Sequence, residues 1–301
     1  MKIRTRKIAL LLMLCAAIPA RAALTVFSCE PEWAALAGEI GGDRVKVFSA
    51  TTAMQDPHYI QARPSLIAKA RGADLLFCTG AELEAGWLPM VLRKARNNKI
   101  SPGQPGHLMA AEQVELLEIP QQLDRSMGDV HASGNPHMHL DPHNILRVAE
   151  VLQARLISID GGGAELYRTR FDQFKDRWQD AIGHWDQQAG LLRGKKVVVH
   201  HKEWTYLLHW LGLERIATLE PKPGVPPNAG HLSALKQQLS QTPATAIVRS
   251  PINDPRPGEW LSNETGIPVL VLPYTVGGSE DTKTLQALFD DILKQLLDLA
   301  Q

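Results

Sequence analysis

Hydrophobic residues in the first half of the chain form short runs separated by stretches with helical spacing. Runs rich in β-branched and aromatic residues predict strands, and apolar positions three or four residues apart predict helices. We expect strands at 24–28, 45–49, 74–77 and 115–117, and helices at 31–40, 65–70, 81–95 and 142–157. Strands that alternate with helices indicate parallel α/β units.

A single apolar stripe marks a long helix in the middle of the chain. Large apolar side chains recur there at steps of three or four, at Tyr167, Phe171, Phe174, Trp178, Ile182 and Trp185. This spacing predicts a helix over 164–189, ~40 Å long at 1.5 Å per residue. Such a helix is long enough to run behind two domains and join them; the alternative is a long core helix of one lobe.

A second α/β set follows the long helix. Its expected strands are 196–200, 215–219, 245–248 and 269–272, and its expected helices are 204–211, 232–241, 258–265 and 282–297. The sequence therefore predicts an α/β protein of two lobes, each with a parallel sheet flanked by helices, joined by one long helix. We divide it into a signal peptide (1–22), an N-terminal lobe (23–160), the linking helix (161–192) and a C-terminal lobe (193–301).

The N-terminus has the three parts of a secretory signal. A basic start is followed by an apolar run over 8–18 and by the small-residue site Ala20-Arg21-Ala22. The apolar run is too short to span a bilayer as a regular helix. We expect an exported periplasmic protein cleaved near Ala22, with an uncleaved membrane anchor as the alternative.

Removal of the signal changes the charge balance. The whole chain has 32 basic and 32 acidic side chains, and the signal contains five basic and no acidic ones. The mature chain then has 27 against 32, a net charge of −5. This argues against a nucleic-acid partner, which needs a basic face, and suits a protein that collects cations.

Two cysteines remain after cleavage, Cys29 and Cys78, each at the end of an apolar run. If those runs are neighbouring parallel strands, the thiols can meet, and an oxidising compartment permits a disulfide. The sequence does not decide between a disulfide and two buried free thiols. A thiolate zinc site is not expected, because the chain has no Cys-x-x-Cys motif.

Histidines stand at places where an α/β protein binds ligands. His58 follows the second predicted strand, His137 lies late in the first lobe, and His200 and His201 end the first strand of the second lobe. Ligands of open α/β sheets bind beyond the carboxyl ends of strands, so these histidines can face one cleft between the lobes. Three imidazoles suit Zn²⁺ or a similar ion. Only one of the adjacent pair can readily enter the cleft, and the pattern does not say which.

Longer segments around these histidines form a set of motifs that covers nearly all of the mature chain. They are Asp56-Pro57-His58-Tyr59, Arg63-Pro64-Ser65, Gly72-Ala73-Asp74-Leu75, Thr79-Gly80-Ala81-Glu82-Leu83-Glu84 with Trp87-Leu88, Asn135-Pro136-His137 with Leu140-Asp141-Pro142, His201 with Trp204 and Tyr206, Gly212-Leu213, and Asn263-Glu264-Thr265-Gly266. This set resembles the metal-binding (cluster A-I) solute-binding proteins of zinc and manganese ABC importers.

The resemblance implies two α/β lobes joined by one long rigid helix. It implies a metal held between the lobes by His58, His137 and His201, with a carboxylate as the usual fourth ligand. It also implies delivery of the ion to an ABC permease in the inner membrane, with no reaction performed on it. We expect a monomer, and a periplasmic metallochaperone is a further partner that the sequence leaves open.

The fourth ligand is the point at which the chain departs from the family pattern. Many relatives carry an aspartate after the last strand, where this chain has Pro273-Tyr274. The turn that follows offers Glu280 and Asp281, of which we favour Glu280. Both acids also suit the start of the helix that follows, and water can then complete the shell.

Asp129, His131 and His139 lie near His137 in the sequence. Zinc-preferring members of the family often carry a longer histidine-rich loop at this place. We expect a solvated loop here, with transient capture of metal as the alternative. His139 stands where the family usually has an aromatic residue, so we expect it to serve in packing or to support the ligands.

The predicted ligands favour zinc over manganese. Three neutral imidazoles and one carboxylate suit Zn²⁺, whereas Mn²⁺ prefers shells richer in oxygen. The hypothesis is a high-affinity periplasmic zinc-binding protein that is not an enzyme, with a manganese-binding protein of the same family as the alternative. A third option is an exported zinc hydrolase with Glu203 as base, and a fourth is a metal-dependent adhesin.

Overall fold

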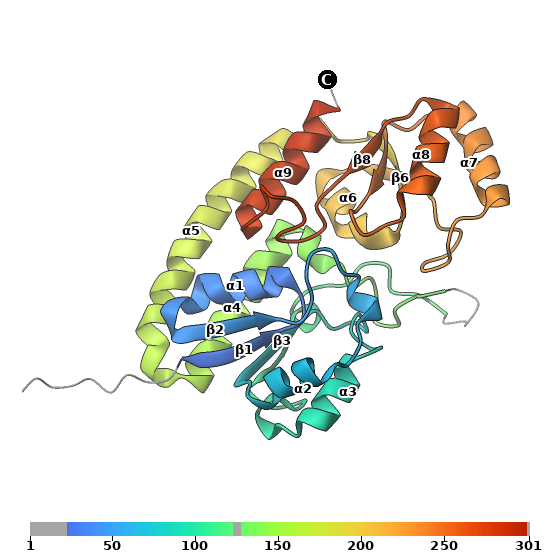
Figure 1. The fold of residues 1–301 in the computed structure, drawn as a ribbon. Helices are drawn as coiled ribbons and strands as arrows, with labels where there is room; N and C mark the ends of the chain where they lie inside the picture. The colour runs from blue at the N-terminus through green and yellow to red at the C-terminus, as the bar shows by residue number, and fades with distance from the viewer. Residues whose placement is uncertain (1–22, 123–127, 300–301) are drawn as a thin grey trace, which may run out of the picture.

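The computed structural model describes residues 23–122 and 128–299 (Figure 1). The predicted signal peptide, residues 1–22, lies outside the described residues. Within the described ranges, none of the helices combines the length and the apolar character needed to cross a membrane.

The first sheet is built from four parallel strands in the order β2-β1-β3-β4. Their bounds are β1 Leu24–Ser28, β2 Val45–Ser49, β3 Leu75–Cys78 and β4 His107–Met109. In register, Phe27 lies between Phe48 on β2 and Leu76 on β3. All four strands therefore end at one edge of the sheet, where parallel α/β proteins place their ligands.

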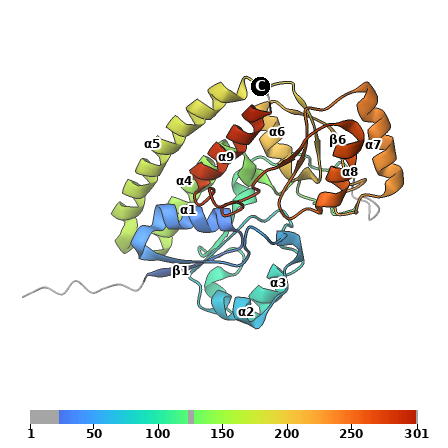
Figure 2. The ribbon, with the colours of Figure 1, turned by 45° about the horizontal axis from the view of Figure 1, so that its top comes forward.

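Helices cover both faces of this sheet (Figures 1 and 2). The helices α2 (Pro64–Arg71) and α3 (Leu88–Ala95) lie on one face, and α1 (Pro31–Gly41) and α4 (Pro142–Ile159) lie on the other. Successive side chains of a strand point to opposite faces of the sheet. Leu76 packs with α2 and α3, and Phe77 packs with α1 and α4. Both faces are apolar because the sheet is buried on both sides.

The second sheet repeats this architecture in the order β6-β5-β7-β8, again all parallel. Its strands are β5 Lys196–Val199, β6 Glu214–Thr218, β7 Ala246–Arg249 and β8 Val269–Val271. Its helices are α6 Thr205–Leu211, α7 Ala229–Gln241, α8 Pro255–Thr265 and α9 Leu285–Asp298.

The long helix α5 (Ala164–Ala189) contacts parts of both halves of the chain. It runs beside α1 and α4 at one end and beside α9 at the other (Figure 1). The indole of Trp178 donates to the Pro142 carbonyl (2.8 Å), and that of Trp185 donates to Asp290 on α9 (2.8 Å). The predicted apolar stripe is buried in one continuous core that includes residues of both sheets, so α5 is a stiff connection.

In the first half, the predicted strand at 115–117 is wrong, and the predicted helix at 81–95 is confirmed only over α3, Leu88–Ala95. Residues 115–117 are not a strand; the fourth strand is β4, which pairs with β3. The backbone of Leu117 instead accepts from Asn135 N–H (2.8 Å) and donates to the Tyr206 hydroxyl (2.9 Å). Residues 81–87 form turns, because Ala81 and Glu82 have φ of 47° and 61°, which no right-handed helix allows.

Candidate metal site

Local hydrogen bonds fix His58 just beyond β2. Asp56 precedes a short 3-10 helix, η2 (Pro57–Tyr59), and its carboxylate accepts from the His58 backbone N–H at 2.9 Å. The same carboxylate lies 2.7 Å from Nδ1 of the His58 ring. An ionised carboxylate only accepts, so this contact favours the tautomer of the neutral ring with the proton on Nδ1. Burial would raise the pKa of Asp56, but the bonds to His58 lower it, so Asp56 is ionised at neutral pH.

His137 is held in the loop before η6 (Met138–Leu140). Its backbone N–H donates to the Asn135 side chain (3.0 Å), and its Nδ1 lies 2.8 Å from the Tyr274 hydroxyl. Asn135 also donates to the Lys202 carbonyl (2.9 Å), which ties this loop to the second half of the chain. The ring is almost fully buried, and this burial holds the pKa of His137 well below 6.5. A neutral imidazole at this position is ready to ligate a metal.

His201 follows β5 and is the member of the histidine pair that faces the cavity. Its Nδ1 lies 2.6 Å from the carboxylate of Glu220, which follows β6. Burial alone would lower the pKa of His201, but the bond to Glu220 and the charges of Glu203 and Asp56 raise it to about 9. His200 is buried and is not among the residues that line the cavity.

The three rings lie close together at one cavity. Their centres are 5.6 Å apart for His58 and His137, 5.8 Å for His137 and His201, and 6.2 Å for His58 and His201. Tetrahedral zinc with bonds of ~2.1 Å would bring imidazole centres to about 5 Å. The observed ring centres are farther apart than in such a site, by about 1 Å.

Each imidazole has an oxygen partner at Nδ1: Asp56, Tyr274 and Glu220 respectively. Oxygen partners at the far nitrogen fix ring orientation and raise the basicity of the nitrogen that binds metal. Nδ1 of each ring is thus engaged by an oxygen, which leaves Nε2 as the nitrogen through which each ring can bind a divalent ion.

Acidic side chains surround this centre. Asp56, Glu203 and Glu220 line the same cavity of ≈ 130 Å³ as the three histidines. The Glu203 carboxylate is buried, and its two oxygens have no hydrogen-bond partner among the described residues. Burial raises the pKa of Glu203, and a nearby cation would favour its ionised form. The cavity thus attracts positive charge.

A model of the family described as "ZnuA: Zinc-uptake complex component A periplasmic" matches residues 26–298. The chain belongs to this family. Its members are metal-binding solute-binding proteins of zinc and manganese ABC importers, so the chain is an extracytoplasmic binding protein and not an enzyme.

The chain is also similar to curated proteins and to solved structures. The manganese ABC transporter substrate-binding lipoprotein PsaA of Streptococcus anginosus is 21% identical over 249 residues, covering 81% of this chain and 77% of PsaA. A crystal structure of ZnuA has a TM-score of 0.78 at 20% identity, covering 93% of this chain and 100% of that one. A Mn-bound periplasmic metal binding protein from Candidatus Liberibacter asiaticus has a TM-score of 0.74 at 17% identity, covering 92% and 100%. At these identities the structures establish the shared fold.

The structure does not bring Glu280 to the three histidines. Glu280 and Asp281 are exposed, and neither lines the cavity. The turn that carries them closes on itself, because Gly277 N–H donates to the Thr282 carbonyl (2.7 Å) and Ser279 N–H donates to the Thr282 hydroxyl (2.9 Å). Both carboxylates are thereby left in solvent.

Two residues near the three histidines were not among the ligands predicted from the sequence. His131 has its Nε2 3.2 Å from Nε2 of His58, and Glu220 supports His201. The spacing of Asp129 and His131 marked that loop as a place of interest, whereas an isolated glutamate after a strand gave no signal. His139 is buried behind the site, with Nε2 3.1 Å from the Tyr274 carbonyl.

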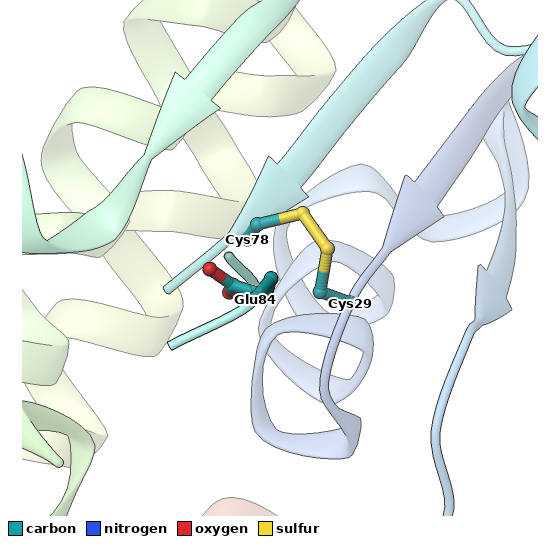
Figure 3. Close-up of side chains that lie close together, drawn as sticks. All are labelled: Cys29, Cys78 and Glu84. Carbon is teal, nitrogen blue, oxygen red and sulfur yellow. A yellow bond between two sulfur atoms is a disulfide. The ribbon is translucent and has the colours of Figure 1, made fainter. Parts of the chain in front are cut away.

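A second group of ligand-type side chains lies elsewhere, at the ends of β1 and β3. Cys29, Cys78 and Glu84 lie close together (Figure 3). The two cysteines form a disulfide, which decides between the two alternatives that the sequence left open. Disulfide sulfurs are not thiolates, so this group is not a metal site.

Proposed function

We propose that the protein captures Zn²⁺ in the periplasm and delivers it to an ABC permease in the inner membrane. His58, His137 and His201 are the proposed protein ligands, each through Nε2. The observation that carries the proposal is that all three rings meet at one cavity while Nδ1 of each faces an oxygen partner.

The choice of zinc follows from the ligand chemistry. Imidazole nitrogen suits Zn²⁺ and is a poorer match for Mn²⁺, which prefers oxygen ligands. Two of the cavity carboxylates, Asp56 and Glu220, are already bonded to histidine rings. They serve better as supports for those rings than as ligands.

Manganese is the alternative, and one observation favours it. The cavity is lined by Asp129 and Glu203 in addition to the two bonded carboxylates. If Glu203 and water were ligands, the metal ion would have oxygen ligands in addition to the histidine nitrogens. PsaA, to which the chain is similar, is named as the substrate-binding lipoprotein of a manganese ABC transporter.

Transport requires that the ion be held tightly and then released. We propose two lobes, residues 23–160 and 193–301, with residues 161–192 as the stiff link between them. His58 and His137 come from the first lobe and His201 from the second, so a small relative movement of the lobes changes the geometry of the shell. The permease would obtain the ion by favouring the wider arrangement.

The direct test is the zinc affinity of His137→Ala, measured by competition with a chelator. Loss of an oxygen partner to a metal-bound histidine already costs ~10–100-fold in affinity, so loss of a ligand is expected to cost more than about 100-fold. His184→Ala, at an exposed position on α5, is the matched control and should bind as the unaltered protein does. An unchanged dissociation constant for His137→Ala would overturn the site.

A further inference from the structure

A fourth imidazole lies against the proposed zinc site. Nε2 of His131 is 3.2 Å from Nε2 of His58, and the two ring centres are 5.3 Å apart. In a tetrahedral zinc site two ligand nitrogens are about 3.4 Å apart and their ring centres about 5 Å apart. The pair already has the separation of two ligands of one ion.

His131 also shares a cavity with two of the proposed ligands. Together with His137 and His201 it lines a cavity of ≈ 50 Å³, and His137 and His201 also line the larger cavity that contains His58. The two cavities therefore lie side by side and share two of the proposed ligands. His131 comes from a loop, residues 128–134, whereas His58 and His201 come after strands β2 and β5.

Contacts with both halves of the chain hold this loop in place. On one side, Asp129 accepts a hydrogen bond from the Tyr59 hydroxyl, and Ser133 donates to Glu82 through N–H (3.1 Å) and hydroxyl (2.7 Å). On the other side, Asp129 N–H donates to the Pro223 carbonyl at 2.9 Å. The loop thus bridges the first half of the chain and the segment after β6.

Two glycines permit the loop 128–134 to lie close to the segment after β6. A Cβ on Gly128 would lie 2.2 Å from the Pro223 carbonyl oxygen, and a Cβ on Gly224 would lie 2.2 Å from an Asp129 carboxylate oxygen. Both glycines have positive φ, 80° and 73°. Larger residues would separate the two backbones. The position of His131 therefore depends on a glycine in its own loop and on a glycine in the segment after β6.

We propose that His131 is the fourth protein ligand, which completes a shell of four imidazoles, and that the loop 128–134 closes the site by bringing it there. This inference rests on the proposed zinc function. His131 thereby replaces Glu280, which we favoured as the fourth ligand from the sequence. Four neutral nitrogen ligands leave the charge of the ion to be balanced by Asp56 and Glu220 behind the rings.

Glu203 is the rival for this place, because it is buried beside His201 with both oxygens unpartnered among the described residues. The two possibilities differ in the number of imidazoles around zinc. X-ray absorption at the zinc edge counts histidine rings through their outer-shell scattering. Four imidazoles in the mature protein and three in His131→Ala are expected, with Glu203→Gln unchanged at four.

Affinity provides the second measurement. His131→Ala should weaken zinc binding by about tenfold or more, comparable at least to the loss of an oxygen partner to a bound histidine. His184→Ala should leave both the ring count and the affinity unchanged. Three imidazoles in the unaltered protein, or a His131→Ala protein that matches it in both measurements, would overturn the inference.

The same series separates this inference from the proposed function. If His137→Ala loses zinc while His131→Ala does not, the zinc site stands and the fourth ligand is wrong. If the unaltered protein binds no zinc, the proposed function fails and the role of His131 fails with it. Circular dichroism melting of each metal-free variant shows that a lost affinity reflects the site and not the fold.

Discussion

The imidazole of His201 lies 2.6 Å from the carboxylate of Glu220 at the wall of the cavity. Burial alone would favour a neutral ring, but Glu220 raises the pKa of His201 to about 9. In the metal-free protein at neutral pH the ring therefore carries a proton on Nε2, the nitrogen proposed to bind zinc. His137 differs, because burial lowers its pKa well below 6.5.

Zinc binding should consequently release about one proton from His201 at pH 7. Between pH 9 and pH 7 the affinity should fall as pH falls, by roughly tenfold per pH unit, because proton and metal compete for one nitrogen. Calorimetric titration in buffers with different ionisation enthalpies measures the release. A binding enthalpy that does not depend on the buffer would contradict the protonation of His201.

Replacement of Glu220 by glutamine should remove this proton release. The amide is neutral, so it no longer stabilises the charged form of His201, and the pKa falls towards that of a buried histidine. Zinc affinity should fall by ~10–100-fold at pH 9, where the proton competes least, since Glu220 also supports the bound ring. Equal proton release in Glu220→Gln and the unaltered protein would show that another group is its source.

The buried pair Glu30 and Glu84 predicts a loss of stability as pH rises. Burial raises the pKa of both carboxyl groups, that of Glu84 to about 7. A carboxyl whose folded pKa exceeds its unfolded value stabilises the fold below the unfolded pKa, and this contribution disappears as pH rises through the folded pKa. The metal-free protein should lose stability between about pH 4.5 and 7 through this pair.

Glu84→Gln tests this prediction. The amide oxygen can still accept from the N–H groups of Thr79 and Gly80, which now donate to the carboxylate. The variant should be more stable than the unaltered protein at pH 8 by about 1–3 kcal/mol and similar to it at pH 5. Urea unfolding at the two pH values measures the difference. Parallel pH profiles for the two proteins would exclude the pair as the cause.

The disulfide between Cys29 and Cys78 should stabilise the first sheet without supporting the metal site. It joins β1 to β3 across a sequence separation of 49. On chain entropy alone, a loop of this size is worth about 4 kcal/mol. The double variant Cys29→Ala, Cys78→Ala should unfold at lower urea but bind zinc with the original affinity. A large loss of affinity in a variant that is still folded would contradict this separation of roles.

The contact between Tyr59 and Asp129 should slow the loss of zinc. Asp129→Ala removes the acceptor for the Tyr59 hydroxyl while leaving the Asp129 N–H bond to Pro223. A looser loop should raise the dissociation rate more than it lowers the association rate, because most affinity changes appear in dissociation. Stopped-flow chelation measures this rate, with Asp172→Ala on α5 as the control. An unchanged dissociation rate would mean that the loop does not hold the ion.

Elements with regular periodicity could be predicted from the sequence. The strands β1 and β2 and the helix α5 begin and end where their patterns predicted, because burial on defined faces sets those patterns. Local sequence failed where a contact distant in the chain decides the structure. Leu116 and Leu117 have the composition of a strand, but Tyr206 and Asn135 take the backbone groups of Leu117.

In the candidate site, too, residues in local motifs could be predicted, and contacts between residues remote in the sequence could not. The three histidines could be proposed as ligands because each lies in a recognisable motif, and all three line one cavity in the structure. Glu280 was chosen by its position after the last strand, yet the hydrogen bonds of its own turn leave it in solvent. The approach of His131 to His58 depends on a loop fixed by Tyr59, Glu82 and Pro223, which are remote in the sequence.

The central claim is that three histidines form a zinc site. Elemental analysis of the mature protein after exhaustive dialysis, with zinc and manganese offered together, tests it most directly. The account predicts one tightly held zinc per chain and little manganese, and loss of that zinc in His137→Ala. Preferential retention of manganese, or no retained metal, would contradict it.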